Sequence, residues 1–416
     1  MGKTVIIIGG GIIGLSTAYY LIKEGHQVTV IDKSDMDGGA SYVNAGYLTP
    51  SHIIPLASPG MMAKGIKFMF NSSSPFYMKP RFDSDFLKWA WSFNKSSSKL
   101  NVERAIPLIK EFNLISRELY FEMQRSGELG DFHLERKGLL MLYKSQKEAA
   151  HEKEVSKRAL DEGLEVSYLN RAQLDTMQPN LNIEIEGAVH YECDAHSTPT
   201  QVMALLKSYL KEQNVQFKLK EEVVGFESSE SQISKVTTNK RSYAADEIVI
   251  ASGSWSRAIG KKLGLKILLE AGKGYRIDVS RELDIRMPAI LMEAKMAVTP
   301  MNGFTRFAGT MEFSGINHKI RKERVDAIAD LAPTYYNGLQ ILQPERDAAQ
   351  CGLRPISPDG LPYIGRTSKY DNLTIATGHA MMGWSLGPAT GKLVSEIIAS
   401  RKTAMAISAF SPDRKF

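Results

Sequence analysis

The clearest pattern of apolar residues lies at the start of the chain. Residues 5–8 form an uninterrupted Val/Ile run, which predicts a strand buried on both faces. A helical pattern follows over residues 12–24, and Gly25 is placed to end it. A second apolar strand is expected over residues 28–31, directly before Asp32. This order of strand, helix and strand predicts that a sheet domain starts here.

The remaining sequence alternates between predicted helices and strands. Buried strands near residues 1, 247 and 373 suggest one domain assembled from distant segments, with a second domain inserted. Residues 351–365 are dense in Pro and Gly and predict a rigid loop. Helices are expected over residues 103–124, 145–162, 198–211 (N-cap Thr198, first residue Pro199), 322–331 and 388–399, with another starting at Ser254. Strands are expected over residues 132–143 (turn at 136–138), 215–226, 233–237, 242–244, 247–253, 267–279, 289–300, 303–313 and 373–378.

Three glycines after the first strand follow the order G-x-G-x-x-G. Gly9 permits the tight turn, Gly11 lets the backbone approach a pyrophosphate, and Gly14 lets the helix pack closely on the strand. Asp32 lies 18 residues past Gly14, where an acid can bind ribose hydroxyls. An acid disfavours a 2′-phosphate, so the pattern indicates FAD or NAD rather than NADP. A membrane helix or signal peptide over the same uncharged run is rejected, because the spaced glycines and second strand fit neither.

Two further segments have unusual composition. Residues 38–46, GGASYVNAG, predict close backbone approach to a ligand beside the phosphate site, with a plain turn as the alternative. Residues 51–93 are rich in Met and aromatic residues. They form either core and active-site cover or an apolar flap that contacts a membrane or partner. Gly383, Gly387 and Gly391 mark a second helix start that can bind an anion or polar carbonyl.

Composition narrows the classes of protein. The 416 residues, 43% of them hydrophobic, can bury a large core in two domains. Two cysteines, Cys193 and Cys351, exclude a disulfide framework, a thiolate zinc site and an iron–sulfur cluster, and a reducing compartment fits best. The net charge of +6 is scattered without a long basic helix, so we expect no nucleic-acid partner. We expect no metal and a cytoplasmic location, with peripheral contact to the inner face of the membrane through residues 51–93 as the alternative.

Taken together, the sequence motifs resemble those of the FAD-dependent D-amino-acid dehydrogenase and glycine/sarcosine oxidase family. The motifs that carry the resemblance span nearly the whole chain, and 44–51 together with 383–385 lean toward the bacterial D-amino-acid dehydrogenase branch. They are the fingerprint ending at Asp32, SYVNAGYLTPS (41–51), IVIASGSWS (248–256), KGY (273–275), GLRPISPDGLPYIG (352–365) and TGHAMMGWSLGPATG (377–391).

The resemblance implies an α/β plus α+β fold. A Rossmann-like FAD-binding domain is built from residues 1–65, 151–270 and 346–416, and a substrate or cap domain, centred on an antiparallel sheet, from 66–150 and 271–345. It implies non-covalent FAD, since no histidine or cysteine stands out as a tether, and no NAD site. The residues expected to bind the cofactor are Gly9, Gly11, Ile12, Ile13, Gly14, Asp32, Lys33, Ser41, Asn44, Ala45, Gly46, Tyr47, Leu48, Val224, Ala251, Gly253, Trp255, Gly352, Gly378, His379, Gly383, Trp384 and Ser385.

The resemblance also implies the chemistry. A hydride leaves the amino-acid Cα for flavin N5, with no need for a metal or strong base. Arg354 of the GLRP motif is the expected carboxylate anchor, with a structural brace as the alternative, and Tyr275 is a second donor. The 378–383 loop lacks the arginine of glycine-oxidase relatives, so a more apolar pocket is expected. Lys273 either tunes the flavin or faces solvent, and His379 contacts flavin or substrate or is structural. Arg306 and Glu312 are opposite charges on one strand, for which structural cross-strand pairing is expected.

The leading hypothesis is a D-amino-acid dehydrogenase that passes electrons to a carrier or quinone, with D-proline or hydroxy-D-proline as candidate substrates. The alternatives are an oxygen-using glycine/sarcosine-type oxidase, a non-catalytic flavoprotein subunit of a membrane-associated complex and, more distantly, an NAD-dependent dehydrogenase. The oligomeric state stays open.

Overall fold

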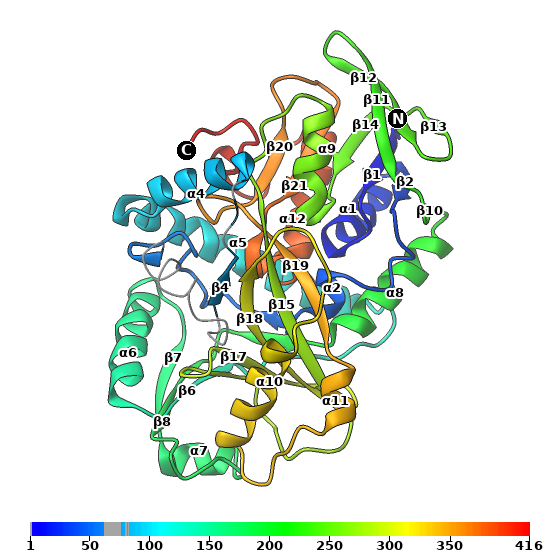
Figure 1. Ribbon diagram of the computed structural model, residues 1–416. Coiled ribbons are helices and arrows are strands. Elements are labelled where there is room, and N and C mark those ends of the chain that lie inside the picture. Colours follow the sequence, from blue (N-terminus) through cyan, green and yellow to red (C-terminus); the bar gives the residue numbers. More distant parts are fainter. Residues whose placement is uncertain (1, 62–75, 80, 82) are drawn as a thin grey trace.

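A six-stranded sheet forms the centre of the upper half of the molecule in Figure 1. The computed structural model describes residues 2–61, 76–79, 81 and 83–416. Five strands of the sheet are parallel, and β20 is antiparallel to β21. The predicted assembly of this sheet from distant segments is therefore confirmed. Its order is β10 (Gln216–Lys218), β2 (Gln27–Ile31), β1 (Thr4–Ile8), β14 (Glu247–Ile250), β21 (Leu373–Thr377) and β20 (Tyr363–Arg366).

Both faces of this sheet are covered, which explains the uninterrupted apolar run of β1. Val5 and Ile7 point into one apolar core, and Ile6 and Ile8 point into another on the opposite face. The first core contains residues of α1 (Ile12–Lys23), α5 (Lys99–Ser126), α8 (Pro199–Glu212) and α12 (Gly387–Ile398). The second is closed by α9 (Ser256–Lys262) and the antiparallel sheet of β11 (Val223–Ser229), β12 (Gln232–Thr238) and β13 (Ser242–Tyr243).

A nine-stranded, mostly antiparallel sheet fills the lower half of the molecule (Figure 1). Its order is β19 (Gln350–Ile356), β15 (Glu270–Val279), β18 (Phe304–Phe313), β17 (Met296–Met301), β16 (Ala289–Leu291), β6 (Leu139–Tyr143), β8 (Gly187–Tyr191) and β7 (Val166–Asn170), with β4 (Phe76–Met78) beside β18. The helices near it are α4 (Ser84–Ser96), α6 (Gln146–Asp161), α7 (Arg171–Met177), α10 (Lys322–Leu331) and α11 (Gln343–Asp347).

A small fourth sheet contains three short strands that adjoin elements of the six-stranded and nine-stranded sheets along the chain. It comprises β3 (Tyr47–Leu48), β9 (Ala195–Ser197) and β5 (Leu134–Glu135), with β9 in the middle. The short helix α2 (Ala40–Val43) precedes β3 and packs against β19.

The two-domain boundaries stay a prediction, and the structure places two segments as follows. β7 and β8, within the 151–270 segment expected in the FAD-binding domain, pair in the nine-stranded sheet. α5, within the expected cap segment 66–150, packs on α12 in the core of the six-stranded sheet.

Several predicted elements differ from the observed ones. The 351–365 loop is wrong, because its ends form β19, which pairs with β15, and β20. The strand over 132–143 divides at its predicted turn into β5 and β6, but these two strands join different sheets. Likewise 215–226 divides into β10 and β11, and 289–300 into β16 and β17. Thr198 does precede α8, but its hydroxyl does not cap that helix, since it accepts the N–H of Asn302 and bonds His133 Nδ1.

The described part of 51–93 places some of its aromatic residues in the core and leaves others exposed. Phe86, Trp89 and Phe93 of α4 are buried with Phe313 and Ile356 in one apolar cluster. Residues 62–75, 80 and 82, including Phe68, Met69, Phe70 and Phe82 of this segment, lie outside the described residues. Of the helices in the described part of the chain, none combines the length and apolarity required to cross a membrane.

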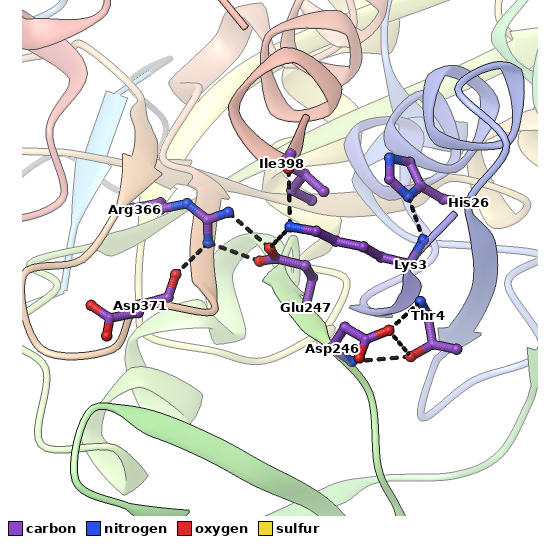
Figure 2. A network of polar contacts seen from close by, with 8 residues as sticks. All are labelled: Lys3, Thr4, His26, Asp246, Glu247, Arg366, Asp371 and Ile398. Carbon is purple, nitrogen blue, oxygen red and sulfur yellow. Dashed lines mark hydrogen bonds and ion pairs between the residues drawn. The ribbon is translucent and has the colours of Figure 1, made fainter. Parts of the chain in front are cut away.

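Polar residues fasten the six-stranded sheet at the edge where β1 and β14 begin (Figure 2). The buried carboxylate of Glu247 accepts two hydrogen bonds from Arg366, at 2.8 and 2.9 Å, and one from Lys3 at 2.7 Å. Lys3 Nζ also donates to the carbonyl of Ile398 at the end of α12. These charges close the amino edge of the parallel strands, so the opposite, carboxyl edge is the one left for a ligand.

Candidate active site

The turn between β1 and α1 has the shape of an anion site. Gly14 packs so tightly that a Cβ there would lie 1.9 Å from the carbonyl oxygen of Gly9. Gly11 is the N-cap of α1 and has no capping side chain. Ser41 accepts the N–H of Ile12 at 2.9 Å. Among the described residues none accepts the next two N–H groups of the helix, those of Ile13 and Gly14, so both donors are available to a phosphate.

Asp32 lies beside this turn at the end of β2. One carboxylate oxygen accepts the N–H of Gly10 at 2.8 Å, and the other accepts the N–H and hydroxyl of Ser34. A carboxylate has about four acceptor positions, so Asp32 keeps acceptor capacity for ribose hydroxyls. The glycine turn and the acid are thus together, as their spacing predicted.

An aromatic group adjoins the residue after Asp32. Lys33 Nζ lies 3.8 Å from the ring centroid of Trp255, and His318 stacks on that ring at 5.9 Å. Burial, followed by the positive charges of Lys33 and Lys273, lowers the pKa of His318. Lys33 and Trp255, both predicted cofactor residues, are therefore in contact.

The other predicted residues at this end lie around β14. The carbonyl of Ala251 is 2.6 Å from where a Gly9 Cβ would lie, so Ala251 borders the glycine turn. Thr377 donates to the carbonyl of Gly253 at 3.1 Å. The side chain of Val224 is exposed on β11, and its carbonyl accepts a hydrogen bond from Lys262.

Hydrogen bonds attach the 44–48 segment to β16 and β17 of the nine-stranded sheet. Tyr47 donates to the carbonyls of Ala289 and Val298 at 2.8 Å, and Thr299 donates to the carbonyl of Ala45. Gly46 accepts the N–H of Ser197, Asn44 accepts one bond from Arg306, and Leu48 is fully buried.

Arg306 and Glu312 both make cross-strand ion pairs with β15, as predicted: Glu312 with Lys273 and Arg306 with Asp278. Arg306 makes two bonds to Asp278, which lies directly across from it on β15, because the register of β15 and β18 places these two residues opposite. Burial lowers the pKa of Arg306 to about 9, so it remains charged at neutral pH.

The polar side chains of the loop before α12 form hydrogen bonds with other residues of the protein. Trp384 Nε1 donates to the Ser197 hydroxyl at 2.9 Å, and Ser385 donates to Asn113 at 2.6 Å. His379 bonds the hydroxyl of Thr390 at 3.0 Å, and burial lowers its pKa to about 3. The predicted contacts of these residues, like those of Gly378 and Gly383 in the same loop, would therefore come mainly from backbone groups.

Gly352 lets strand β19, which carries the predicted substrate anchor, pack closely against α2. A Cβ at Gly352 would lie 2.9 Å from Cα of Ala40, the residue before Ser41. β19 therefore runs directly over α2, and Arg354 follows two residues later on the same face of the strand.

The guanidinium of Arg354 lies flat over Gly274 of the neighbouring strand. A Cβ at Gly274 would be 2.3 Å from the guanidinium carbon, so only glycine leaves room for it. Arg354 Nη1 donates to the carbonyl of Thr310 at 3.0 Å. Burial lowers the Arg354 pKa to about 10, which keeps the side chain cationic at neutral pH.

A β-bulge in β18 directs the carbonyl of Thr310 toward Arg354. The register moves from Lys273↔Glu312 to Tyr275↔Gly309, so Thr310 and Met311 together face Gly274. Thr310 has φ of 64°, an uncommon conformation for a β-branched residue. Sequence reasoning missed Thr310, since nothing in a local pattern marks a bulge, and it gave Gly274 no role although the residue lies inside the KGY motif.

Tyr275 points into a buried charged cluster. Its hydroxyl donates to Glu312 at 2.8 Å, and Lys273 Nζ lies 3.1 Å from the other oxygen of the same carboxylate. Lys273 is fully buried and also donates to Asn317, so the solvent-facing alternative is wrong. Burial opposes ionisation of Glu312, but hydrogen bonds from Ser314, Tyr275 and Lys273 outweigh it and hold its pKa below the usual value. As a donor to a substrate, Tyr275 would have to release this carboxylate.

Apolar side chains lie on the other side of Arg354. Met311 Sδ is 3.7 Å from Arg354 Nη1 and belongs to the buried cluster with Ile356 and Phe313. A small apolar cavity adjoins this cluster. It is lined by Leu56, Met61, Phe76, Met78, Trp89, Phe93 and Phe313.

Comparison with known proteins identifies the family of this chain. The chain matches the family described as DAO, FAD dependent oxidoreductase, over residues 4–397. It is 32% identical to a D-amino acid dehydrogenase of Helicobacter pylori over 421 residues (99% of this chain, 100% of the relative) and 30% identical to that of Vibrio atlanticus over 410 residues (95% of each).

Solved structures share the fold. Glycine oxidase from Geobacillus kaustophilus superposes with a TM-score of 0.79 at 23% identity, covering 100% of this chain and 99% of that one. L-Proline dehydrogenase from P. horikoshii gives 0.74 at 20% identity, covering 99% and 97%. At these identities the two structures show the fold alone.

Asp32→Asn should weaken FAD binding about 10- to 100-fold, because a hydrogen bond to a charged group contributes about 1.5–3 kcal/mol. Flavin fluorescence on serial dilution of the purified protein measures the dissociation constant. Asp35→Asn, at an exposed acid of the same loop, is the matched control and should leave it unchanged. Equal affinities in all three proteins would show that Asp32 does not contact the ribose.

Proposed function

We propose, from the premise that this chain belongs to the FAD-dependent oxidoreductase family, that it is a D-amino-acid dehydrogenase. The resemblance read from the sequence motifs is confirmed by the family match. The observation that carries the substrate class is the cationic guanidinium of Arg354, held over Gly274 at the border of an apolar cluster. A carboxylate bound there would place the rest of a small amino acid against apolar side chains.

The residues of the glycine turn fit the cofactor. The free N–H groups of Ile13 and Gly14 would hold its phosphates, Asp32 its ribose, and backbone groups of the 378–385 loop its ring system. When bound, FAD supplies flavin N5 as the acceptor of the hydride that leaves the substrate Cα.

Arg354 would bind the substrate carboxylate and fix its orientation. Five N–H donors belong to a guanidinium, and among the described residues Thr310 supplies the only oxygen recorded on this one. The remaining edge can therefore make the two parallel hydrogen bonds of a carboxylate pair. Because the guanidinium rests on Gly274 and is bonded to the bulge, it is pre-organised, and little order has to be gained when the substrate binds.

The apolar surroundings of Arg354 favour substrates without a charged side chain. Met311, Ile356 and Phe313 offer no partner for a second charge. D-Proline or hydroxy-D-proline, a compact cyclic amine, fits this description, as do other small apolar D-amino acids. The amine reacts in its neutral form, and the imine product hydrolyses in water to a 2-oxo acid and ammonia or, for proline, stays cyclic.

Electrons are proposed to leave through a carrier or quinone, with the cytoplasmic protein peripheral on the inner face of the membrane. Leu87 and Trp91 of α4, one helical turn apart, are 54% and 73% exposed, and Lys88 and Lys95 lie on the same helix. Such an apolar pair with basic neighbours suits an anionic lipid surface.

Co-sedimentation with phosphatidylglycerol vesicles tests this contact. Leu87→Ser with Trp91→Ser should lower the bound fraction at least about threefold, because it removes the exposed apolar area. Leu160→Ser, at an exposed leucine of α6, is the control. Unchanged binding of the double variant would place the membrane contact elsewhere or remove it from the proposal.

Arg354→Ala should keep FAD but lower kcat/KM for D-amino acids about 100-fold or more, since a hydrogen-bonded charge pair with the substrate contributes roughly 3 kcal/mol. Gly274→Ala should act in the same direction, because the new Cβ displaces the guanidinium without touching its charge. Anaerobic bleaching of the flavin band by a panel of D- and L-amino acids measures both.

The controls are Arg104→Ala, an exposed arginine of α5, and Gly225→Ala, where a Cβ meets nothing within 4 Å. Normal turnover of Arg354→Ala would make this arginine a structural brace. No bleaching of the unaltered protein by any D-amino acid would favour a non-catalytic flavoprotein subunit.

After reduction by a D-amino acid, the flavin should reoxidise slowly in air-saturated buffer and at least about tenfold faster with a soluble quinone. Stopped-flow absorbance follows both reactions. Rapid reoxidation by oxygen alone would instead make the protein an amine oxidase of the glycine/sarcosine type.

A further inference from the structure

We propose that His133, Glu135 and His196 form a binding site for one divalent cation of the zinc type. Glu135 lies on β5 and His196 on β9 of the small fourth sheet, and His133 directly precedes β5. None of the three belongs to the set expected to hold FAD or substrate. The two-cysteine count excludes only a thiolate site, whereas imidazole and carboxylate ligands also suit zinc.

The strand pairing brings the three side chains to one face. β5 and β9 are antiparallel, with Leu134 opposite Ser197 and Glu135 opposite His196. Side chains alternate along a strand, so His133 and Glu135 share a face, and directly opposed residues of an antiparallel pair share it too. The ligand atoms of the three residues all lie within 4.8 Å of one another.

The distances match the edges of a tetrahedral site. Glu135 Oε2 lies 3.5 Å from His133 Nε2 and 3.4 Å from His196 Nε2. Zinc bonds to nitrogen and oxygen are about 2.1 Å long, and tetrahedral ligands at that bond length are about 3.4 Å apart. The two edges from Glu135 therefore have the length that a tetrahedral zinc site requires, and the ligand atoms of the two histidines lie within 4.8 Å of each other. The fourth position would be left for water.

His196 supplies the independent sign of a missing partner. Its side chain has no exposed surface, and neither ring nitrogen makes a hydrogen bond to a residue in the described ranges. Buried polar atoms in native proteins nearly always have a partner, and a metal ion would supply one here.

His133 is oriented by an outer hydrogen bond of the kind found around metal-binding histidines. Its Nδ1 lies 2.9 Å from the hydroxyl of Thr198, and the same hydroxyl accepts the N–H of Asn302. With the proton on Nδ1 donated to Thr198, the lone pair of Nε2 faces Glu135. This use of the Thr198 hydroxyl also explains why it does not cap α8.

Lys137 is a built-in competitor for the ion. Its Nζ lies 2.8 Å from Glu135 Oε2, the same oxygen that would bind the metal. The lysine side chain is 45% exposed, so it can turn into solvent when the ion enters. Removing this lysine should therefore strengthen metal binding, an effect that adventitious surface binding would not show.

The test titrates Zn2+ into the FAD-loaded protein after dialysis against EDTA, with isothermal titration calorimetry as the readout. One ion per chain is expected. Loss of an outer partner already costs about 10- to 100-fold in metal affinity, so Glu135→Gln and His133→Ala should each weaken binding at least about 100-fold. Lys137→Gln should strengthen it severalfold, and His151→Ala, at an exposed histidine of α6, should change nothing.

The flavin spectrum and melting temperature of each variant without zinc establish that it is folded. His196→Gln is avoided as the main variant, because this side chain is buried. Absence of a stoichiometric ion, unchanged binding in Glu135→Gln and His133→Ala, or weaker binding in Lys137→Gln would each overturn the proposal.

Discussion

The buried guanidinium of Arg306 links the nine-stranded sheet to the segment that follows β2 of the six-stranded sheet. It lies on the cap strand β18, is paired with Asp278, and donates to the carbonyls of Tyr42 and Asn44 on the segment that leads out of the six-stranded sheet. A charge without solvent contact is tolerated only when its donors are satisfied. The position of α2, and with it the Ser41 hydroxyl that accepts the Ile12 N–H at the start of α1, therefore depends on Arg306 of the nine-stranded sheet. Arg306 therefore fixes the position of α2 relative to β18, and with it the surroundings of a ligand bound beside α2.

The predictable parts of the structure are those whose cause is local. The run at residues 5–8 is continuous because alternate side chains enter two different cores, and the acid at 32 falls beside the glycine turn because β1 and β2 are adjacent. The 351–365 segment was misread because its Pro and Gly content is local, whereas the pairing that makes β19 a strand comes from β15, far away in sequence. The motif in the sequence made Arg354 the candidate substrate anchor but gave no reason for the position of its side chain.

The reason lies in partners that no spacing reveals. Gly274 leaves the space for the guanidinium, and the Thr310 bulge supplies the acceptor that holds it. Both come from neighbouring strands, so they become visible only once the register of the sheet is known. The same holds for His133, Glu135 and His196, which a strand pairing rather than a motif brings together. Contacts between polar residues that depend on strand pairing thus cannot be predicted from the pattern of residues along the sequence.

The order of strands in the six-stranded sheet bears on how the chain folds. β1 is made first, yet it lies between β2 and β14, and β14 in turn pairs with β21 near the other end of the sequence. Contacts between such distant segments make folding slow, since much chain must be ordered before they form. During synthesis the apolar face of β1 that α12 helps to cover stays open until nearly the whole chain has left the ribosome. Transient exposure of this kind invites aggregation, and production of the protein should therefore benefit from slow translation at low temperature and from chaperones.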